Sequence, residues 1–162
     1  MTISIQPYNS AHRDELIALI LPIQQIEFQV PITLADQPDL QDAGGFFENY
    51  PTGKGRFWVA LADEKVVGSI GLLNIGNGQA CLRKMFVHKD FRGKTHNLAQ
   101  NLLEECEKWA VTEGLHEIFL GTREDLYAAR RFYERNGFFL VEKSTLPQNF
   151  PLMAVDSHFY KK

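Results

Sequence analysis

The sequence predicts a single α+β domain, which some schemes class as three-layer α/β, with a mixed, mostly antiparallel twisted sheet and helices on both faces. Two observations support this fold class. Apolar runs and amphipathic segments follow one another as strand, helices, three strands, helix, strand, helix and two strands. The Gly76-Asn77-Gly78 turn indicates a hairpin, and the long helix after residue 97 indicates a right-handed parallel crossover. The 162 residues are enough for one core, so we expect one domain over residues 1–162.

Composition excludes several classes of function. The net charge of −3 and the pI of about 5.9 give no global field that would favour nucleic acid. The N-terminus MTISIQPYN does not resemble a signal peptide, and no run approaches the ~20 apolar residues that cross a bilayer. Cys81 and Cys106 fall on apolar segments, so we expect buried free thiols rather than a disulfide. These features predict a cytoplasmic protein without nucleic-acid or membrane partners.

The N-terminal half is expected to carry one strand and a broken helix. Residues 3–6 alternate apolar and polar side chains, and Pro7 ends this strand. A helix over residues 12–21 should be kinked or broken by Pro22, and a second piece should cover residues 23–30. Residues 31–50 are predicted to be a loop with a short helix after residue 40. The acids of this half hint at a cationic substrate, with a solvated acidic loop as the alternative: Glu27, Asp36, Asp39 and Asp42.

The second half should hold the rest of the sheet. Strands are predicted at residues 56–62, 66–75 and 82–87, and again at 116–122, 138–143 and 152–160. A helix at 97–113 should end at Gly114, and a helix opened by a Thr122/Asp125 capping box should end at Asn136-Gly137. In the last strand we expect one face to hold Met153, Val155, Ser157 and Phe159.

The loop Arg92-Gly93-Lys94-Thr95-His96-Asn97 joins a buried strand to the long helix. Free backbone N–H groups and the positive end of the helix dipole meet two cationic side chains there, which is a physical recipe for holding phosphate. An ordinary polar turn capped by Thr95 or Asn97 is the alternative. A nucleotide P-loop is disfavoured, because His88 stands where its first glycine is needed and no later strand ends in an Asp suited to magnesium.

Two motifs give the sequence a family resemblance. Arg92-Gly93-Lys94 opens a segment that resembles motif A of the GNAT-superfamily N-acetyltransferases, [RQ]-x-x-G-x-[GA]. The stretch from Ala128 to Phe138, AARRFYERNGF, is similar to their motif B, A-x-x-x-[LF]-Y-[ED]-[KR]-x-G-F. The chain departs from the family pattern at Thr95 and Asn97, where small residues are usual, and at Leu126, where the family has Asn.

The resemblance implies acetyl-CoA as a co-substrate and no metal. In that fold two parallel strands splay apart, pantetheine hydrogen-bonds the backbone of Met85 and Val87 as an added strand would, and Phe86 N–H is the expected oxyanion donor. The full set of cofactor-binding residues that we expect is Met85, Phe86, Val87, Arg92, Gly93, Lys94, Thr95, His96, Asn97, Leu98, Thr122 and Tyr133.

Acetyl transfer to an amine also needs a base and an acid. The spacing Leu16, Ile20, Ile23 continues to Glu27, which makes Glu27 the candidate catalytic base, unless it is an exposed Glu on a rotated second helix. His88 and His96 are alternatives. By the resemblance, Tyr133 is the catalytic acid for the departing thiolate; the alternative is a core tyrosine.

The sequence thus predicts an acetyl-CoA-dependent N-acetyltransferase that acetylates a primary amine of a small molecule or peptide by direct attack in a ternary complex. A non-catalytic acyl-CoA-binding module is the alternative, followed by a P-loop nucleotide-binding protein. The aromatic tail at residues 150–160 could form a homodimer edge or complete the acceptor pocket. No motif identifies the acceptor amine.

Overall fold

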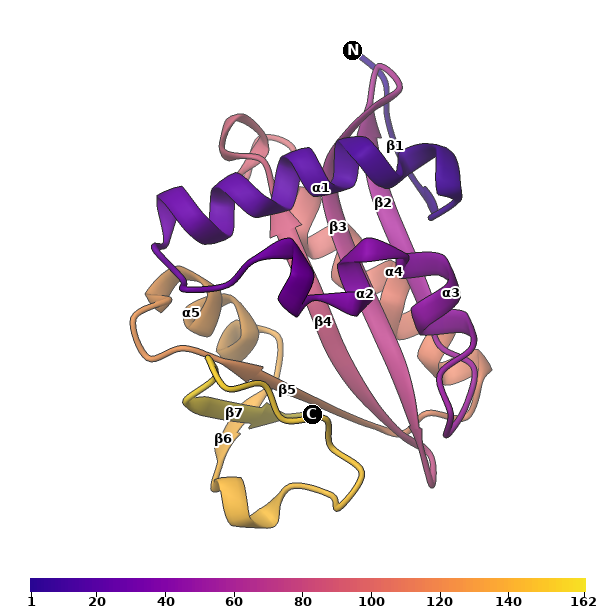
Figure 1. Cartoon of the computed structure of the whole chain (residues 1–162), viewed down its shortest axis with the longest axis vertical. Helices are drawn as coiled ribbons and strands as arrows, with labels where there is room; N and C mark the ends of the chain where they lie inside the picture. The colour runs from indigo at the N-terminus through magenta and orange to yellow at the C-terminus, as the bar shows by residue number, and fades with distance from the viewer.

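The computed structural model describes residues 1–162 and confirms the predicted α+β fold, with one seven-stranded mixed sheet (Figure 1). The strand order is β1-β2-β3-β4-β5-β7-β6, and only β4 and β5 are parallel neighbours. The strands are β1 Ile3–Pro7, β2 Arg56–Ala62, β3 Lys65–Gly76, β4 Gln79–Val87, β5 Glu117–Thr122, β6 Phe139–Val141 and β7 His158–Lys161.

Helices cover both faces of the sheet (Figure 1). Helices α1, α2 and α3 pack on one face, and α4 and α5 pack on the other. The α-helices are α1 Arg13–Pro22, α2 Pro38–Gln41, α3 Ala43–Glu48, α4 Leu98–Thr112 and α5 Tyr127–Arg135. Short turns of other helix types are η1 Ser10–His12, η2 Ile23–Glu27, η3 Leu34–Asp36, η4 Lys89–Phe91 and η5 Lys143–Thr145. None of the helices has the length and apolar composition that a membrane crossing requires.

Strand β2 shows how the sheet separates two cores. Phe57, Val59 and Leu61 enter the core beneath α1 and α3, whereas Trp58 and Ala60 enter the core beneath α4. Successive side chains of a strand point to opposite faces, so a strand covered on both sides must be apolar throughout. This explains the unbroken apolar run in the sequence. It also fixes the register of the central strands, because a shift of one residue would exchange the two cores.

The parallel pair β4 and β5 separates soon after it forms. Pairing covers three positions and ends at Cys81↔Phe119, although β4 continues to Val87 and β5 to Thr122. Beyond this point β4 is paired only with β3. A register shift opposite Ile70 and a left-handed φ of 54° at Lys84 mark a bulge in β4 at the same place. The predicted splay therefore exists, and it exposes one edge of a central strand.

The sequence predicts a kink or break of the helix at Pro22, and the structure shows a change of helix type after Pro22 rather than a break. The helix continues through Pro22 into the π-helical turn η2, where Phe28 N–H donates to the carbonyl of Ile23 at 3.0 Å. A π turn is wider than an α turn and accommodates a missing backbone donor, which keeps the segment helical. Glu27 therefore lies at the end of a helix that leads directly to the splayed strands.

Two other predictions are wrong. Residues 152–157 are not strand, because Asp156 N–H donates to Met153 carbonyl at 3.1 Å and closes a turn, so β7 pairs with β5 only from His158 onward. Met153, Val155 and Ser157 therefore do not share one face of a strand. Thr122 and Asp125 form no capping box, because Arg123 binds the Asp125 carboxylate at 3.1 Å and α5 begins later, at Tyr127.

Candidate active site

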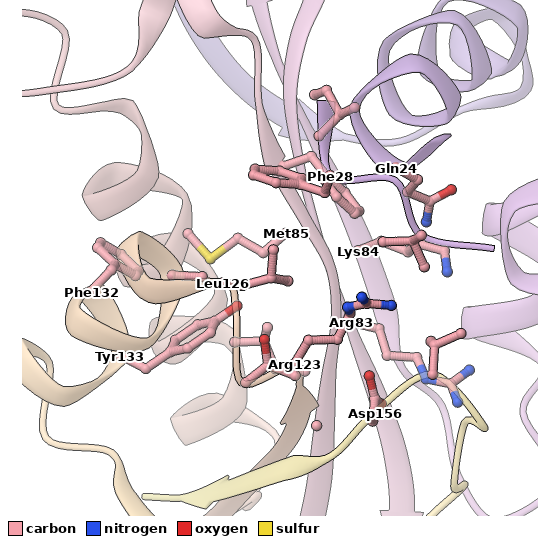
Figure 2. A pocket seen from close by; sticks show the side chains of 18 of the residues that line it. Gln24, Phe28, Arg83, Lys84, Met85, Arg123, Leu126, Phe132, Tyr133 and Asp156 are labelled. Atoms are coloured by element: carbon pink, nitrogen blue, oxygen red, sulfur yellow. The ribbon is translucent and has the colours of Figure 1, made fainter. Parts of the chain in front are cut away.

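A cavity of about 570 Å³ lies where β4 and β5 separate. Its walls come from η2 and the loop after it, the second half of β4, the start of α5 and the loop before β7 (Figure 2). Most lining side chains are apolar, and a few polar groups converge between them, as is typical of a small-molecule site. The cavity brings together these predicted site residues: Met85, Phe86, Val87, Arg92, Gly93, Thr122 and Tyr133.

The free edge of β4 presents specific backbone groups to this cavity. His88 N–H donates to the carbonyl of Val67 on β3 at 2.8 Å, and Phe86 pairs with Ser69. Backbone groups alternate in direction along a strand, so Phe86 N–H points toward β3, while Met85 and Val87 point toward the gap. The register thus favours Met85 and Val87 for an added strand and disfavours Phe86 N–H as the oxyanion donor.

The turn from Arg92 to Asn97 leads into α4 without a side-chain cap. Gly93 has a φ of +91°, which a residue with a Cβ rarely adopts, and Asn97 is left-handed with a φ of 49°. Asn97 makes no capping hydrogen bond, so the first amides of α4 remain open to an anion. Lys94 and Thr95 are exposed at the turn, and the ring of His96 packs on Phe91. The Leu98 side chain is in the core, so Leu98 offers only its backbone.

The side chain of Arg92 connects this turn to η2. Its Nε donates to the carbonyl of Val87 at 2.8 Å, and its guanidinium forms a two-pronged ion pair with Glu27, with Nη2 and Oε1 2.8 Å apart. This hydrogen bonding holds the pKa of Glu27 below its usual value. A carboxylate that binds a guanidinium in this way accepts a proton less readily, which weakens the case for Glu27 as a base.

Tyr133 on α5 is buried at 8% exposure and packs against Phe132, Phe138 and Tyr160. Its hydroxyl points into the cavity (Figure 2) and makes no hydrogen bond within the chain. Every fully buried side-chain nitrogen or oxygen of the protein has a hydrogen-bond partner. Because the Tyr133 hydroxyl has none, it is not fully buried and is accessible from the cavity. Burial raises the pKa of Tyr133 well above its ordinary value, so the phenol stays protonated at neutral pH. The ring is part of the core and the hydroxyl is part of the site.

The four acids of the N-terminal half have structural partners, so none of them is free to bind a cationic substrate. Glu27 pairs with Arg92, Asp36 accepts from Thr33, and Asp42 accepts from Gly45 N–H at the start of α3. Asp39 is buried and lies 3.2 Å from Lys84 Nζ and 3.4 Å from Arg83 Nη1. This network could not be predicted from the sequence. Arg83 and Lys84 interrupt the apolar run at residues 82–87, but no nearby residue in the sequence indicates that Asp39 is their partner.

One titratable group of the cavity wall was not predicted from the sequence. Asp156 lies half-buried in the loop before β7 and lines the cavity with Tyr133 and Lys84 (Figure 2). Its carboxylate sits over Gly121 of β5, where an added Cβ would approach Oδ2 to 2.5 Å. Desolvation raises the pKa of Asp156 to about 6, although Arg83, Lys84 and Arg123 oppose the shift. No sequence pattern marks Asp156, because residues 152–160 resemble an ordinary alternating strand.

Comparisons with known proteins agree with this geometry. Residues 19–138 match the family model described as the acetyltransferase (GNAT) family. An acetyltransferase of the GNAT family from Staphylococcus aureus is 35% identical, with a TM-score of 0.93 and coverage of 99% of this chain and 98% of that one. An acetyltransferase from Streptococcus agalactiae is 33% identical, with a TM-score of 0.91 and coverage of 99% and 97%.

A more distant structure shares the fold. The PaiA N-acetyltransferase of Thermoplasma acidophilum, solved in complex with coenzyme A, is 18% identical, with a TM-score of 0.77 and coverage of 100% and 99%. Curated proteins give no significant match. The family model spans most of the chain and includes the splayed strands, the turn before α4 and helix α5. The chain therefore belongs to the GNAT family of acetyltransferases.

Proposed function

We propose that this acetyltransferase moves the acetyl group of acetyl-CoA to a primary amine of a small molecule or peptide, by direct attack within a ternary complex. The splay between β4 and β5 is the observation that carries the proposal. The uncapped turn before α4 lies at one end of the free β4 edge, and an apolar cavity containing the Tyr133 hydroxyl lies beside that edge. A long thioester and a small acceptor can meet in such a site.

The cofactor would follow the free edge of β4. Met85 and Val87 offer the backbone groups that an extended pantetheine arm needs. The pyrophosphate would lie at Arg92–Leu98, where amides of the α4 N-terminus are uncapped and Gly93 leaves space. Thr122 and Tyr133 form the opposite wall. Leu126 also lines the cavity and offers only apolar contact, so the hydrogen bond that the family forms from this position is absent. PaiA, which shares this fold, was solved with coenzyme A bound, which supports coenzyme A as the type of ligand.

Two groups of the chain would act on the thioester. A backbone N–H of the β4 edge stabilises the oxyanion, and strand alternation favours Met85, which lies toward the acyl end. Tyr133 donates its proton to the departing thiolate. Its raised pKa keeps the proton available, and its hydroxyl is reached from the cavity.

The cysteines support direct attack rather than an acyl-enzyme. Cys106 is buried in the core, and Cys81 is 1% exposed at the cavity wall. Desolvation raises the pKa of the Cys81 thiol to about 12, so almost no thiolate is present at neutral pH. Steady-state kinetics with varied acetyl-CoA and amine should therefore give intersecting reciprocal plots; parallel plots would indicate a covalent intermediate instead.

Ligand-dependent thermal unfolding, followed by thiol release, tests the function. Acetyl-CoA and CoA at 100 times Kd should stabilise the protein by about 2.7 kcal/mol, and Mg-ATP should not. A panel of amino acids, polyamines and lysine peptides should then contain an amine that accelerates thiol release from acetyl-CoA. Stabilisation by CoA without thiol release from any amine would favour the non-catalytic binding module. A response to ATP alone would favour the nucleotide-binding alternative.

A further inference from the structure

We propose that Asp156 is the general base that takes the proton of the acceptor ammonium. This inference rests on the proposed acetyl transfer. Asp156 lies outside both sequence motifs that the chain shares with the family. The base then comes from the loop before β7, on the β5 side of the splay, while the acid Tyr133 comes from α5 (Figure 2).

The fold holds Asp156 firmly at this place. Asp156 N–H donates to the carbonyl of Met153, and Ser157 N–H donates to the carbonyl of Thr122 at 2.8 Å, so the loop is tied to the end of β5. The carboxylate rests on Gly121, the only residue type that leaves room for it there. Gly121 of β5 thus leaves space for the Asp156 carboxylate just beyond the point where β5 separates from β4.

The carboxylate is free to accept a proton. Its oxygens make no hydrogen bond or ion pair within the chain, and neither is sealed from the cavity. By contrast, Glu27 is held by Arg92, and Asp39 is held by Arg83 and Lys84. Asp125, the other carboxylate that lines the cavity, is held by Arg123, so Asp156 is the lining carboxylate whose lone pairs are available to a substrate.

Charged and titratable groups face Asp156 from each neighbouring element. They are Arg83, Lys84 and Cys81 of β4, Arg123 after β5 and Tyr133 of α5, with Asp39 behind Lys84. Burial raises the pKa of Asp156 to about 6 and the nearby cations limit the rise, so the group is ionised above that pH. A base that titrates just below neutral pH combines a high ionised fraction with useful basicity.

The step balances in atoms and charge. An acceptor amine with a pKa near ~10 arrives as ammonium, and Asp156 takes one proton from its nitrogen. The nitrogen lone pair then forms the C–N bond, and the carbonyl π pair moves to oxygen. When that pair returns, the C–S bond breaks and the thiolate takes the Tyr133 proton. The nitrogen then gives a second proton to the Tyr133 phenolate, which becomes a phenol again. Asp156 releases its proton to solvent. The products are the acetamide, CoA thiol and one proton.

Substitution of Asp156→Asn in the full chain tests the assignment, with Asp14→Asn as a matched control at a 94% exposed side chain. At pH 7.5 kcat/KM for the amine should fall by ~10²-fold or more in the first variant and stay unchanged in the second. The acidic limb near pH 6 should disappear, and the residual rate should rise tenfold per pH unit up to the pKa of the amine. The acetyl-CoA-dependent rise in Tm should be retained.

Two results would overturn the assignment. These are a loss below threefold, or a larger loss in which the limb near pH 6 survives. A second variant guards against a purely structural effect. Gly121→Ala displaces the carboxylate without removing it, so the rate should fall while an acidic limb persists; an unchanged rate would also count against the proposal. If the wild-type protein acetylates no amine at all, the proposed function fails, and that outcome differs from an active Asp156→Asn variant.

Discussion

The cofactor side and the acceptor side of the cavity are built in different ways. The cofactor side is one nearly continuous stretch, from the β4 edge through the turn at residues 92–97 to α4, and it presents mainly backbone groups. The acceptor side is assembled from η2, β4 and the loop before β7, and it presents side chains. Backbone groups can hold a ligand whose structure is fixed. The residues that supply those groups lie close together in the chain, so they form a recognisable sequence motif. A variable acceptor is held by side chains brought together only by the fold.

Buried Asp39 and half-buried Asp156, which both interact with the charge of Lys84, sharpen this contrast. The charges of Asp39 and Asp156 both act on the pKa of Lys84, but Asp39 forms an ion pair with it at 3.2 Å and is buried, whereas Asp156 forms no ion pair with it and lines the cavity. The same residue type therefore serves structure in one case and, on our proposal, chemistry in the other. Their substitutions should change stability in opposite directions.

Asp39→Ala should give the largest effect, on stability. It leaves Lys84 and Arg83 without their buried carboxylate, and breaking such a pair typically costs ~3–5 kcal/mol. For a chain of this size the Tm should fall by roughly 6–20 °C. Asp14→Ala, at an exposed position, should leave the Tm within about 2 °C. A fall of similar size in both variants would show that the buried network is not special.

Tyr133→Phe should give the next largest effect, on turnover. It removes only a hydroxyl that has no partner in the chain, so stability should change little. Because general acid catalysis contributes ~10²-fold or more, kcat should fall by that factor while the KM for acetyl-CoA is retained. Tyr50→Phe, the same change at a tyrosine outside the cavity, is the control. Turnover within about threefold of wild type would remove Tyr133 as the acid.

Asp156→Asn should raise stability at pH 7 by up to about 2.7 kcal/mol, from a shift of roughly two pKa units. The sign follows from linkage: the folded state binds more protons than the unfolded state between about pH 4 and pH 6, so wild-type stability falls as pH rises through this window. Denaturant titrations at pH 4 and pH 7 should show the advantage only at pH 7. An equal or lower stability at pH 7 would contradict the raised pKa.

Sequence reasoning found the parts of the fold that local pattern encodes. The three central strands, the long helix ending at Gly114 and the β4–β5 crossover follow from apolar periodicity and turn chemistry, and the structure has them. The failures lie where distant contacts decide. The helix continues past Pro22 as a π turn, and Asp125 pairs with Arg123 instead of capping a helix. Residues 152–157 form a turn that places Asp156 over Gly121 instead of joining the sheet.

The candidate site divides along the same line. Met85, Val87, the 92–97 turn and Tyr133 were predictable because two motifs mark them, and the cavity brings most of them together. Asp156 and the Asp39–Lys84 pair were not, since each needs residues about 35 or more positions apart to meet. A carboxylate in an apparently alternating strand looks like a solvent-facing residue until the fold shows what lies beside it.

Arg92→Ala should have a smaller effect, and it separates the two sides most directly. If Arg92 contacts the pyrophosphate, the KM for acetyl-CoA should rise by about tenfold, equivalent to ~1.4 kcal/mol, while kcat is retained. An acetyl-pantetheine thioester lacks the pyrophosphate, so wild type and variant should use it equally well. Arg92→Lys should recover part of the loss, because charge returns without the two-pronged geometry. If the KM for both thioesters rises together, Arg92 acts through Glu27 and the placement of η2 rather than through phosphate. That outcome would move Arg92 from the cofactor side to the acceptor side.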